Sequence, residues 1–370
     1  MNKMRILHIV SDLDRGGVEK QMIEVIRALP NLDHHVFSLL GDGPLFSEIE
    51  NTNITFAAQK NPLKLLREIR SLIKEIRPNV IQTWMFHSDL FGGLAAIGTG
   101  RPVVWSYHAS KLERSSLKFT TYVGIRTLGI LSHVVPKLVI ACSDSSYHAA
   151  VENRYSKWKV EVIYNGIRTN HYIPLSEPRV QTERVVVLPA RWHVHKGHRI
   201  ILEAWKLLKE NQVPGKLVLM GDGIDKNNID LNALIVEYGI VDSVALLGEV
   251  SDMRGAYQSA DIVAISSLTE AMPLALVEGM SSGLVPVVTD VGDMRKMIGA
   301  AGFICQAGNA LDLSRALERA LLADDSEIKT RSELSRALAV ENYDIGITAS
   351  KYQDKWSSIS SLSTTSRGSE

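Results

Sequence analysis

The chain has 370 residues, which is more than one ordinary hydrophobic core holds and predicts two domains. Its composition, 45% hydrophobic and 22% charged, is typical of a soluble globular protein. The net charge of zero hides an asymmetry, because residues 1–170 hold 21 Lys and Arg against 15 Asp and Glu, and the remainder holds 20 against 26. A mildly basic first half suits an anionic lipid or substrate, although so small a surplus is also typical of solvated surface. Nucleic acid is excluded as a partner because no basic stripe with interleaved aromatic residues is present.

The chain also lacks the features of exported and membrane-spanning proteins. No run of 18 apolar residues occurs, and the first residues, MNKMRILHIVSD, are too short and too soon charged for a signal peptide. The two cysteines, Cys142 and Cys305, lie far apart in sequence, so we expect no disulfide framework. These observations predict a cytoplasmic protein.

In the first half of the chain, short apolar runs alternate with amphipathic stretches. We predict a helix over 18–30, with Met22, Val25, Ile26 and Leu29 on one face, and further helices at 62–78 and 88–98. The predicted strands are 4–12, 34–41, 79–85, 103–108, 138–144 and 159–167. This alternation predicts right-handed βαβ units, and therefore a doubly wound parallel sheet.

The same pattern restarts after a polar, proline-bearing segment at 174–182. Strands are predicted at 184–190, 216–223, 243–250, 261–267 and 285–290, with helices between them. The fold class is thus α/β, with two Rossmann-like domains at 1–174 and 175–344. A last helix is predicted over 345–360, and residues 361–370 hold too few apolar side chains to order themselves.

A glycine pair, Gly16 and Gly17, follows the first predicted strand and precedes a helix. Ligands of open α/β sheets bind at this carboxyl edge. The loop is not GxGxxG and no acid ends the second strand, so a nicotinamide cofactor is disfavoured. Asp12 and Asp14 in the same loop are interpreted as a polar turn rather than a metal-binding pair.

Two cations follow the strand at 184–190. Arg191 and Lys196 lie where a strand ends and a helix begins, which suits a diphosphate because the helix dipole adds to the two charges. Ordinary surface charge is the alternative. His193, His195 and His198 lie in the same stretch, but without a nearby cysteine or a conventional ligand spacing they are interpreted as solvated side chains rather than zinc ligands.

Two acids, Glu270 and Glu278, flank a predicted helix start in SSLTEAMPLALVEGMSSG. Pro273 is favoured at the first helical position, and Gly283 is the residue that best tolerates a left-handed helix end. Glu270 then precedes the helix, and Glu278 lies on its second turn. Acids placed this way suit the two ends of one elongated ligand.

These residues, in this order, closely resemble a known family. Arg191, Lys196 and the two glutamates, followed by Gly283 and Pro286, are similar to the retaining, nucleotide-sugar-dependent glycosyltransferases of family 4, which have the GT-B fold. The segments GGVE at 16–19, YNGI at 164–167, MGDG at 220–223 and LLGEVSDM at 246–253 extend the likeness over most of the chain.

The resemblance implies a role for each matching position. Arg191 and Lys196 would bind the donor diphosphate, Glu278 the ribose and Glu270 the transferred sugar, and His108 would lie near the reaction centre. By itself, a histidine at a strand end is more often a structural residue, and the position of His108 at the predicted cleft makes the two interpretations about equal. The implied catalytic residues are His108, Arg191, Lys196 and Glu270, and the remaining donor-binding positions are Gly16, Gly17, Gly221, Gly248, Glu249, Val250, Met272, Pro273, Leu274, Ala275 and Glu278. One position departs from the family, because Ala271 stands where glycine is common and its methyl group would narrow the space around the donor sugar.

The implied activity is transfer of a sugar, with retention, from a nucleotide donor that is expected to be UDP-linked. The acceptor would be a glycan or polyprenyl-linked saccharide in surface polysaccharide or glycolipid biosynthesis, and neither a metal ion nor a cofactor is expected. A nucleotide-sugar epimerase or hydrolase, or a sugar-binding protein without activity, is the alternative.

The stretch 111–137 carries both apolar and cationic residues. A helix there is predicted either to lie on an anionic membrane at its cytoplasmic face or to pack as an ordinary helix with a solvated edge.

Overall fold

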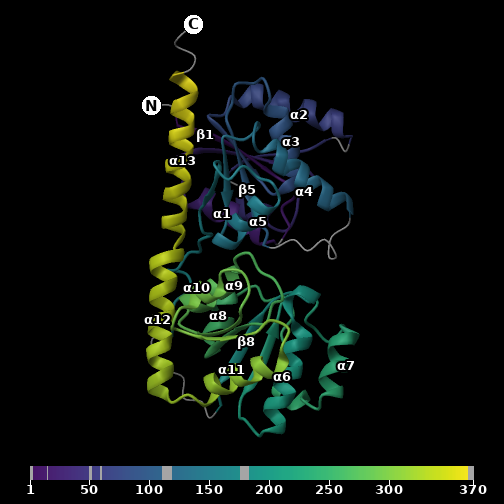
Figure 1. Ribbon diagram of the computed structural model, residues 1–370, viewed down its shortest axis with the longest axis vertical. Helices are drawn as coiled ribbons and strands as arrows, with labels where there is room; N and C mark the ends of the chain where they lie inside the picture. Colours follow the sequence, from purple (N-terminus) through teal and green to yellow (C-terminus); the bar gives the residue numbers. More distant parts are fainter. Residues whose placement is uncertain are drawn as a thin grey trace. The chain divides into compact units, whose positions relative to one another are not determined.

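The structure is a computed structural model that describes residues 3–14, 16–49, 52–58, 61–110, 119–175 and 183–365 (Figure 1). The chain divides into two units: unit 1 comprises Met1–Gly166 with Ile345–Glu370, and unit 2 comprises Ile167–Asp344. No helix of the described residues is long and apolar enough to cross a membrane.

The boundary between the units precedes the expected position at residue 174. The segment after Gly166 belongs to unit 2 because its carbonyl groups are bound there. The Ser281 hydroxyl donates to the carbonyl of Tyr172 at 2.8 Å, and the Arg336 guanidinium donates to the same carbonyl at 2.8 Å. The polar segment that suggested a linker thus follows the boundary, and residues 176–182 lie outside the described residues.

Unit 1 contains a parallel sheet of seven strands in the order β3-β2-β1-β4-β5-β6-β7. The strands are β1 (Arg5–Val10), β2 (Asp33–Ser38), β3 (Asn53–Phe56), β4 (Val80–Trp84), β5 (Val103–Tyr107), β6 (Leu138–Ala141) and β7 (Val160–Val162). The predicted doubly wound parallel sheet is confirmed. β3 was not predicted, because it is a four-residue edge strand whose burial alternates weakly.

Helices cover both faces of this sheet (Figure 1). They are α1 (Gly17–Ala28), the short 3-10 helix η1 (Phe46–Ile49), α2 (Pro62–Ile76), α3 (Phe86–Ala96), α4 (Phe119–Leu131), α5 (Asp144–Glu152) and α13 (Ile345–Thr365). α1 and α13 share one apolar cluster with the sheet, and α2 to α5 line the cluster on the other face. The predicted buried face of α1 is confirmed, since Met22, Val25, Ile26 and Leu29 are all buried.

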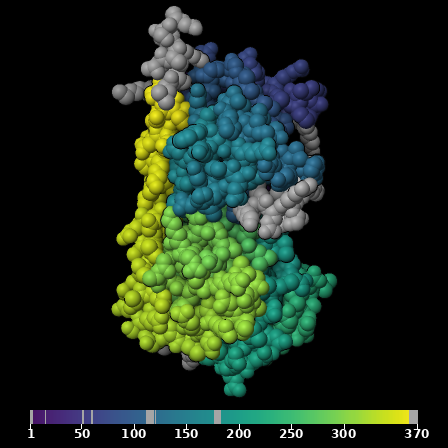
Figure 2. All heavy atoms as spheres, in the orientation of Figure 1, coloured from purple at the N-terminus to yellow at the C-terminus, as the bar shows by residue number. Residues whose placement is uncertain are grey.

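Helix α13 joins unit 1 although it ends the sequence. Tyr352 and Trp356 are fully buried, and the Trp356 indole donates to the Gln82 side chain at 3.0 Å. Figure 2 shows the helix, in yellow, against the blue and teal surface of unit 1. The helix continues to Thr365, so residues 361–365 are not the disordered tail that was expected, and 366–370 lie outside the described residues.

Unit 2 contains a parallel sheet of six strands in the order β10-β9-β8-β11-β12-β13. The strands are β8 (Val185–Pro189), β9 (Lys216–Met220), β10 (Val244–Leu246), β11 (Ile262–Ile265), β12 (Val285–Thr289) and β13 (Phe303–Cys305). β13, a three-residue edge strand, was not predicted. The helices are η3 (Val194–Lys196), α6 (His198–Glu210), α7 (Ile229–Glu237), η4 (Val241–Ser243), α8 (Met253–Gln258), α9 (Leu274–Ser281), α10 (Met294–Ile298), α11 (Ala310–Leu322) and α12 (Asp325–Tyr343).

Candidate active site

The loops after β8 and β11 meet at the carboxyl edge of the unit 2 sheet. Gly197 has φ +68°, and a Cβ atom there would lie 2.0 Å from the Ser266 carbonyl oxygen, so only glycine permits this approach. The Leu268 amide donates to the His195 carbonyl at 2.8 Å, and the Ser266 hydroxyl donates to the Lys196 carbonyl at 2.9 Å. These contacts fix the backbone that carries Lys196.

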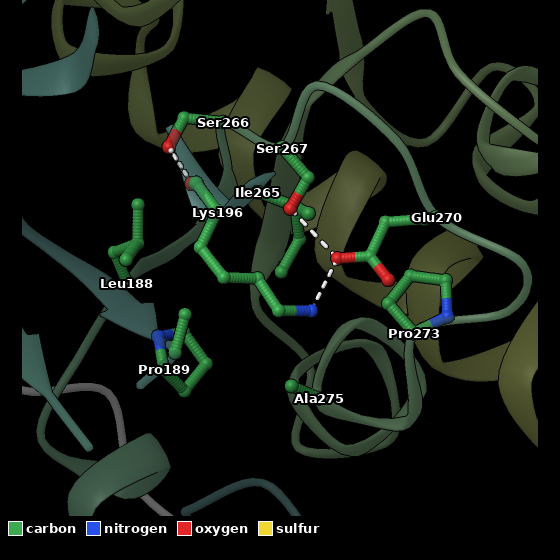
Figure 3. Close-up of a pocket in the computed structure, with 10 residues that line it drawn as sticks. Leu188, Pro189, Lys196, Ile265, Ser266, Ser267, Glu270, Pro273 and Ala275 are labelled. Atoms are coloured by element: carbon green, nitrogen blue, oxygen red, sulfur yellow. Dashed lines mark hydrogen bonds and ion pairs between the residues drawn. The ribbon is translucent and has the colours of Figure 1, made fainter. Parts of the chain in front are cut away.

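The side chains of Lys196 and Glu270 form an ion pair with 2.6 Å between Nζ and Oε1. The Ser267 hydroxyl donates to the same carboxylate oxygen at 2.7 Å, as Figure 3 shows. Ser267 is held in turn by Thr289, whose hydroxyl donates to its carbonyl at 2.6 Å. The lysine side chain is 29% exposed and the glutamate side chain 11%, so a ligand can reach the pair from solvent.

The ion pair lines a pocket that ends at the start of α9 (Figure 3). Pro273 caps the helix and Ala275 lies on its first turn, so the positive end of the helix dipole faces the pocket. The pocket is lined by Leu188, Pro189, Ala190, Lys196, Ile265, Ser266, Ser267, Glu270, Pro273 and Ala275. A lysine beside a helix start suits an anion.

The predicted helix after Glu270 is present, but it begins one residue later than expected, because Pro273 has an extended backbone and is the N-cap instead of the first helical residue. α9 starts after Pro273, and Gly283, with φ +80°, follows its C-cap. Glu278 lies buried on its second turn, where its Oε2 accepts a hydrogen bond from the Tyr257 hydroxyl at 2.8 Å. Burial raises the pKa of Tyr257, and the adjacent Glu278 carboxylate raises it further, so the hydroxyl stays a donor.

The glycine loops after β9 and β10 lie beside Arg191. The Gly221 amide donates to the Gly248 carbonyl at 2.7 Å, and a Cβ atom on Gly221 would lie 2.8 Å from the backbone nitrogen of Arg191. The Arg191 side chain is exposed, and Glu249 and Val250 continue the same loop. Strand order therefore brings the unit 2 residues singled out from the sequence, including Met272 and Leu274, to one edge of the sheet.

The remaining predicted site residues belong to unit 1. Gly16 and Gly17 follow β1 at the start of α1, and the Asp14 amide donates to the Asp12 carboxylate at 3.1 Å, as a polar turn requires. His108 follows β5 at the same edge. Both of its ring nitrogens are buried without a hydrogen-bond partner among the described residues, and burial lowers its pKa to about 4. An imidazole with a lowered pKa, whose ring nitrogens have no partner among the described residues, is suited to bind a ligand hydroxyl.

The histidines near Lys196 differ from the expectation in one respect. His198 is buried rather than solvated, because its Nε2 contacts the Ala190 carbonyl at 3.2 Å and its ring packs on Trp192. Burial lowers its pKa to about 4. No group of three or more His, Cys, Asp or Glu side chains in the described ranges is arranged to hold a metal ion.

Sequence reasoning missed Ser267 and Tyr257. Ser267 lies three residues before Glu270 in the same loop, which is a usable signal for a side chain that contacts the carboxylate. Tyr257 lies 21 residues before Glu278 and on another helix, so no local pattern indicates their hydrogen bond.

Two family models match this chain. Residues 15–171 match the model described as Glycosyltransferase Family 4, and residues 183–323 match Glycosyl transferases group 1. The chain belongs to the family 4/group 1 glycosyltransferases. This glycosyltransferase is 23% identical over 377 residues to the UDP-Gal:alpha-D-GlcNAc-diphosphoundecaprenol alpha-1,3-galactosyltransferase of Escherichia coli, with 95% of this chain and 96% of the relative covered. An uncharacterized glycosyltransferase of Haemophilus influenzae is 24% identical, with 93% and 96% covered.

Solved structures of this type confirm that the glycosyltransferase has the GT-B fold. HepE of Anabaena in complex with UDP superposes with a TM-score of 0.85 at 22% identity, covering 96% of this chain and 100% of that one. Sucrose-phosphate synthase of Thermosynechococcus elongatus gives 0.82 at 17% identity, covering 97% and 100%.

Proposed function

We propose that this glycosyltransferase moves a sugar from a UDP-linked donor to a polyprenyl-diphosphate-linked saccharide, with retention of configuration. The observation that carries the proposal is the Lys196–Glu270 ion pair at the start of α9. Support for the donor comes from HepE, whose structures contain UDP and UDP-glucose, and support for the acceptor comes from the Escherichia coli relative, whose name specifies a diphosphoundecaprenol saccharide. Such an acceptor would bring the enzyme to the cytoplasmic face of the membrane.

The ion pair would exchange partners when the donor binds. Diphosphate oxygens compete with Glu270 for the Lys196 ammonium, and Arg191 adds a second cation from the same β8–α6 loop. Glu270, still held by Ser267, then has carboxylate capacity for the hydroxyl groups of the donor sugar. Glu278 would use the oxygen not bound to Tyr257 for the ribose hydroxyls. Backbone from Gly248 to Val250 would contact the base.

The chemical step breaks the bond between the sugar C1 and the diphosphate oxygen. The acceptor hydroxyl oxygen forms its bond to C1 on the same face, and its proton passes to the departing diphosphate. Charge develops on that diphosphate, where Lys196, Arg191 and the α9 dipole stabilise it. These groups carry enough positive charge for the step to proceed without a metal ion. His108 would hold an acceptor or donor hydroxyl as a neutral hydrogen-bonding group.

Nucleoside diphosphate release tests this function. The purified chain is incubated with UDP-glucose, UDP-galactose, UDP-N-acetylglucosamine or GDP-mannose, with and without a polyprenyl-diphosphate disaccharide. We expect release from a UDP-sugar only with acceptor, in the presence of EDTA, and an anomeric proton coupling that matches the donor. GDP-mannose is included because the Xanthomonas oryzae relative is named for it. Release without acceptor would instead identify a hydrolase, and turnover of GDP-mannose alone would overturn the UDP assignment.

The prediction of membrane contact for residues 111–137 includes α4. Residues 111–118 lie outside the described residues. In α4, Ile125 and Leu128 are buried in the core, while Phe119 and Val123 are exposed. This helix is therefore packed along one face, and its contact with a membrane stays a prediction.

A further inference from the structure

Three neighbouring loops of unit 1 carry large exposed apolar side chains. The loops span 97–102, 132–137 and 153–159, and they precede β5, β6 and β7, which are adjacent in the sheet. Ile97 is 54% exposed, Val134 81% and Trp158 85%. Because parallel strands begin at one edge, these loops form one end of unit 1, which we call the amino-edge patch.

The loops of the patch are fixed to one another. The Lys159 ammonium donates to the carbonyls of His133 and Pro136, each at 2.8 Å, and the Ser156 amide donates to the Ser132 hydroxyl at 2.8 Å. The Lys137 amide donates to the Val103 carbonyl at 2.8 Å, which joins the second loop to β5. The backbone that carries Val134 and Trp158 is thus held by hydrogen bonds between the loops, so little backbone ordering entropy is lost when these side chains bind.

The charge of the patch has one sign. The three loops contain five Lys and Arg residues, namely Arg101, Lys137, Arg154, Lys157 and Lys159, and no Asp or Glu. Arg154 and Lys157 are exposed, and the Lys157 ammonium lies 4.8 Å from the centre of the Trp158 ring. Exposed apolar tips among cations match the chemistry of an anionic bilayer surface, where indole rings and aliphatic side chains enter the headgroup region and lysines reach the phosphates.

We propose that the amino-edge patch is a docking surface for an anionic lipid bilayer. A nucleic acid or another polyanion fits less well, because Val134 and Ile97 offer such ligands no contact of use. β5 separates the patch from His108, and five residues at about 3.3 Å each place them about 16 Å apart. Lipid at the patch therefore leaves the ligand edge of the sheet open. Delivery of a polyprenyl-linked acceptor by this docking rests on the proposed function, but the docking itself does not.

Vesicle sedimentation tests the surface without any substrate. The full chain is mixed with vesicles of phosphatidylglycerol and phosphatidylcholine, or of phosphatidylcholine alone, at low salt. We expect binding only to the anionic vesicles, and a loss of about fivefold in partitioning for each of Lys137→Gln, Arg154→Gln and Lys157→Gln. Val134→Ser with Trp158→Ser removes the apolar contact and should abolish binding at physiological salt, where charge alone is screened.

The matched control is Ile229→Ser with Val236→Ser on α7. These two apolar side chains of unit 2 are 82% and 69% exposed, so their replacement removes exposed apolar surface at another place. We expect unchanged vesicle binding. An equal loss in the control pair, no binding of the unaltered chain to anionic vesicles, or tight binding to dextran sulfate with none to vesicles would each overturn the proposal.

Tryptophan fluorescence gives a second measurement, which reports contact between Trp158 and the bilayer even in variants that still bind vesicles. Of the six tryptophans, Trp84, Trp105, Trp205 and Trp356 are fully buried, whereas Trp158 is 85% exposed. Vesicles with brominated acyl chains should quench the emission, and this quenching should disappear in Trp158→Phe although the variant still sediments with lipid. Quenching that persists in Trp158→Phe would place another surface against the bilayer.

Discussion

The carboxyl edges of the two sheets are built from opposite chemistry. In unit 2 the edge carries permanent charges that compensate each other within reach of solvent, as in the Lys196–Glu270 pair. In unit 1 the part of the edge after β4 and β5 carries aromatic groups and a histidine, with Trp84 packed on Tyr352 and beside His108, whereas Asp12 and Asp14 lie in the loop after β1. A charged edge suits a diphosphate, and a neutral edge suits sugar hydroxyls. The proposed division of donor and acceptor between the units rests on this difference.

The core of unit 1 contains two buried histidines, His8 and His34, that are hydrogen-bonded to each other. The Trp84 indole donates to His8 Nδ1 at 3.2 Å, so His8 must donate from Nε2 to His34 Nδ1 at 2.9 Å. His34 then donates from Nε2 to the Leu29 carbonyl at 3.0 Å. This assignment follows from the hydrogen-bond geometry, and it satisfies every group only if both rings are neutral.

The largest effect on turnover is expected when a charge is removed from the carboxyl edge of the unit 2 sheet. Lys196→Ala deletes the cation nearest the proposed leaving group, and we expect turnover to fall about 10²–10³-fold, as for the loss of one transition-state donor. Nucleoside diphosphate release measures the effect, and thermal unfolding shows that the fold persists. Lys206→Ala, at a lysine of α6 that lies outside the site and has a 42% exposed side chain, is the control. Near-normal turnover in Lys196→Ala would contradict the clamp.

A smaller effect on the reaction is expected when the neutral Tyr257 hydroxyl, which donates to the Glu278 carboxylate, is removed. Tyr257→Phe deletes the hydrogen bond to Glu278, and bonds to charged groups contribute about 1.5–3 kcal/mol, so the donor KM should rise roughly tenfold to a hundredfold. kcat should change little, because the proposed role of Glu278 is to bind the ribose and not the reacting bond. Tyr238→Phe in the same unit is the control. A lower kcat with an unchanged KM would mean that Tyr257 does not act through donor binding.

Much of the unit 2 edge was predictable because its determinants are local. Pro273 and Gly283 mark the ends of α9, and Gly197 marks the close approach of two loops, so the sequence indicates where Lys196 and Glu278 lie. The partners of these residues were not predictable. The Lys196–Glu270 pair joins residues 74 apart in sequence, and only the strand order of the sheet brings them together.

The fold could be predicted from the sequence where apolar runs are long. The prediction failed where contacts with distant residues determine the structure. β3 and β13 are short edge strands that rely on their neighbours for pairing. The boundary between the units depends on hydrogen bonds from Ser281 and Arg336 to Tyr172. The amino-acid composition around Tyr172 gives no sign of these bonds. In unit 1, the His8–His34 contact is invisible in sequence, because a histidine in a strand has the same local pattern whether it is charged or neutral.

The buried histidines make stability depend on pH. Burial lowers the pKa of His8, and His34 and His35 lower it further; burial also lowers the pKa of His34. A histidine whose folded pKa is below the unfolded value of about 6.5 binds fewer protons when folded, so stability is present above pH 6.5 and is lost as the pH falls below it, by about 1.4 kcal/mol per pH unit for each group. Urea unfolding at pH 7.5, 6.5 and 5.5 measures the slope. His8→Asn should reduce it, whereas the exposed His148→Asn should not, and equal slopes in all three proteins would refute the neutral pair.

The smallest effect separates a neutral hydrogen-bonding role for His108 from a proton-transfer role. Because its pKa is lowered to about 4, His108 stays neutral from pH 5.5 to 8, and its protonation should leave no acidic limb in the profile of kcat/KM over that range. His108→Asn should lower kcat/KM by roughly threefold to tenfold, the effect of one neutral hydrogen bond, and equally at every pH. An acidic limb near pH 6.5 that disappears in His108→Asn would show that the ring titrates during the reaction. The unit 1 edge would then take part in charge transfer, and the contrast with unit 2 would fail at the residue on which it most depends.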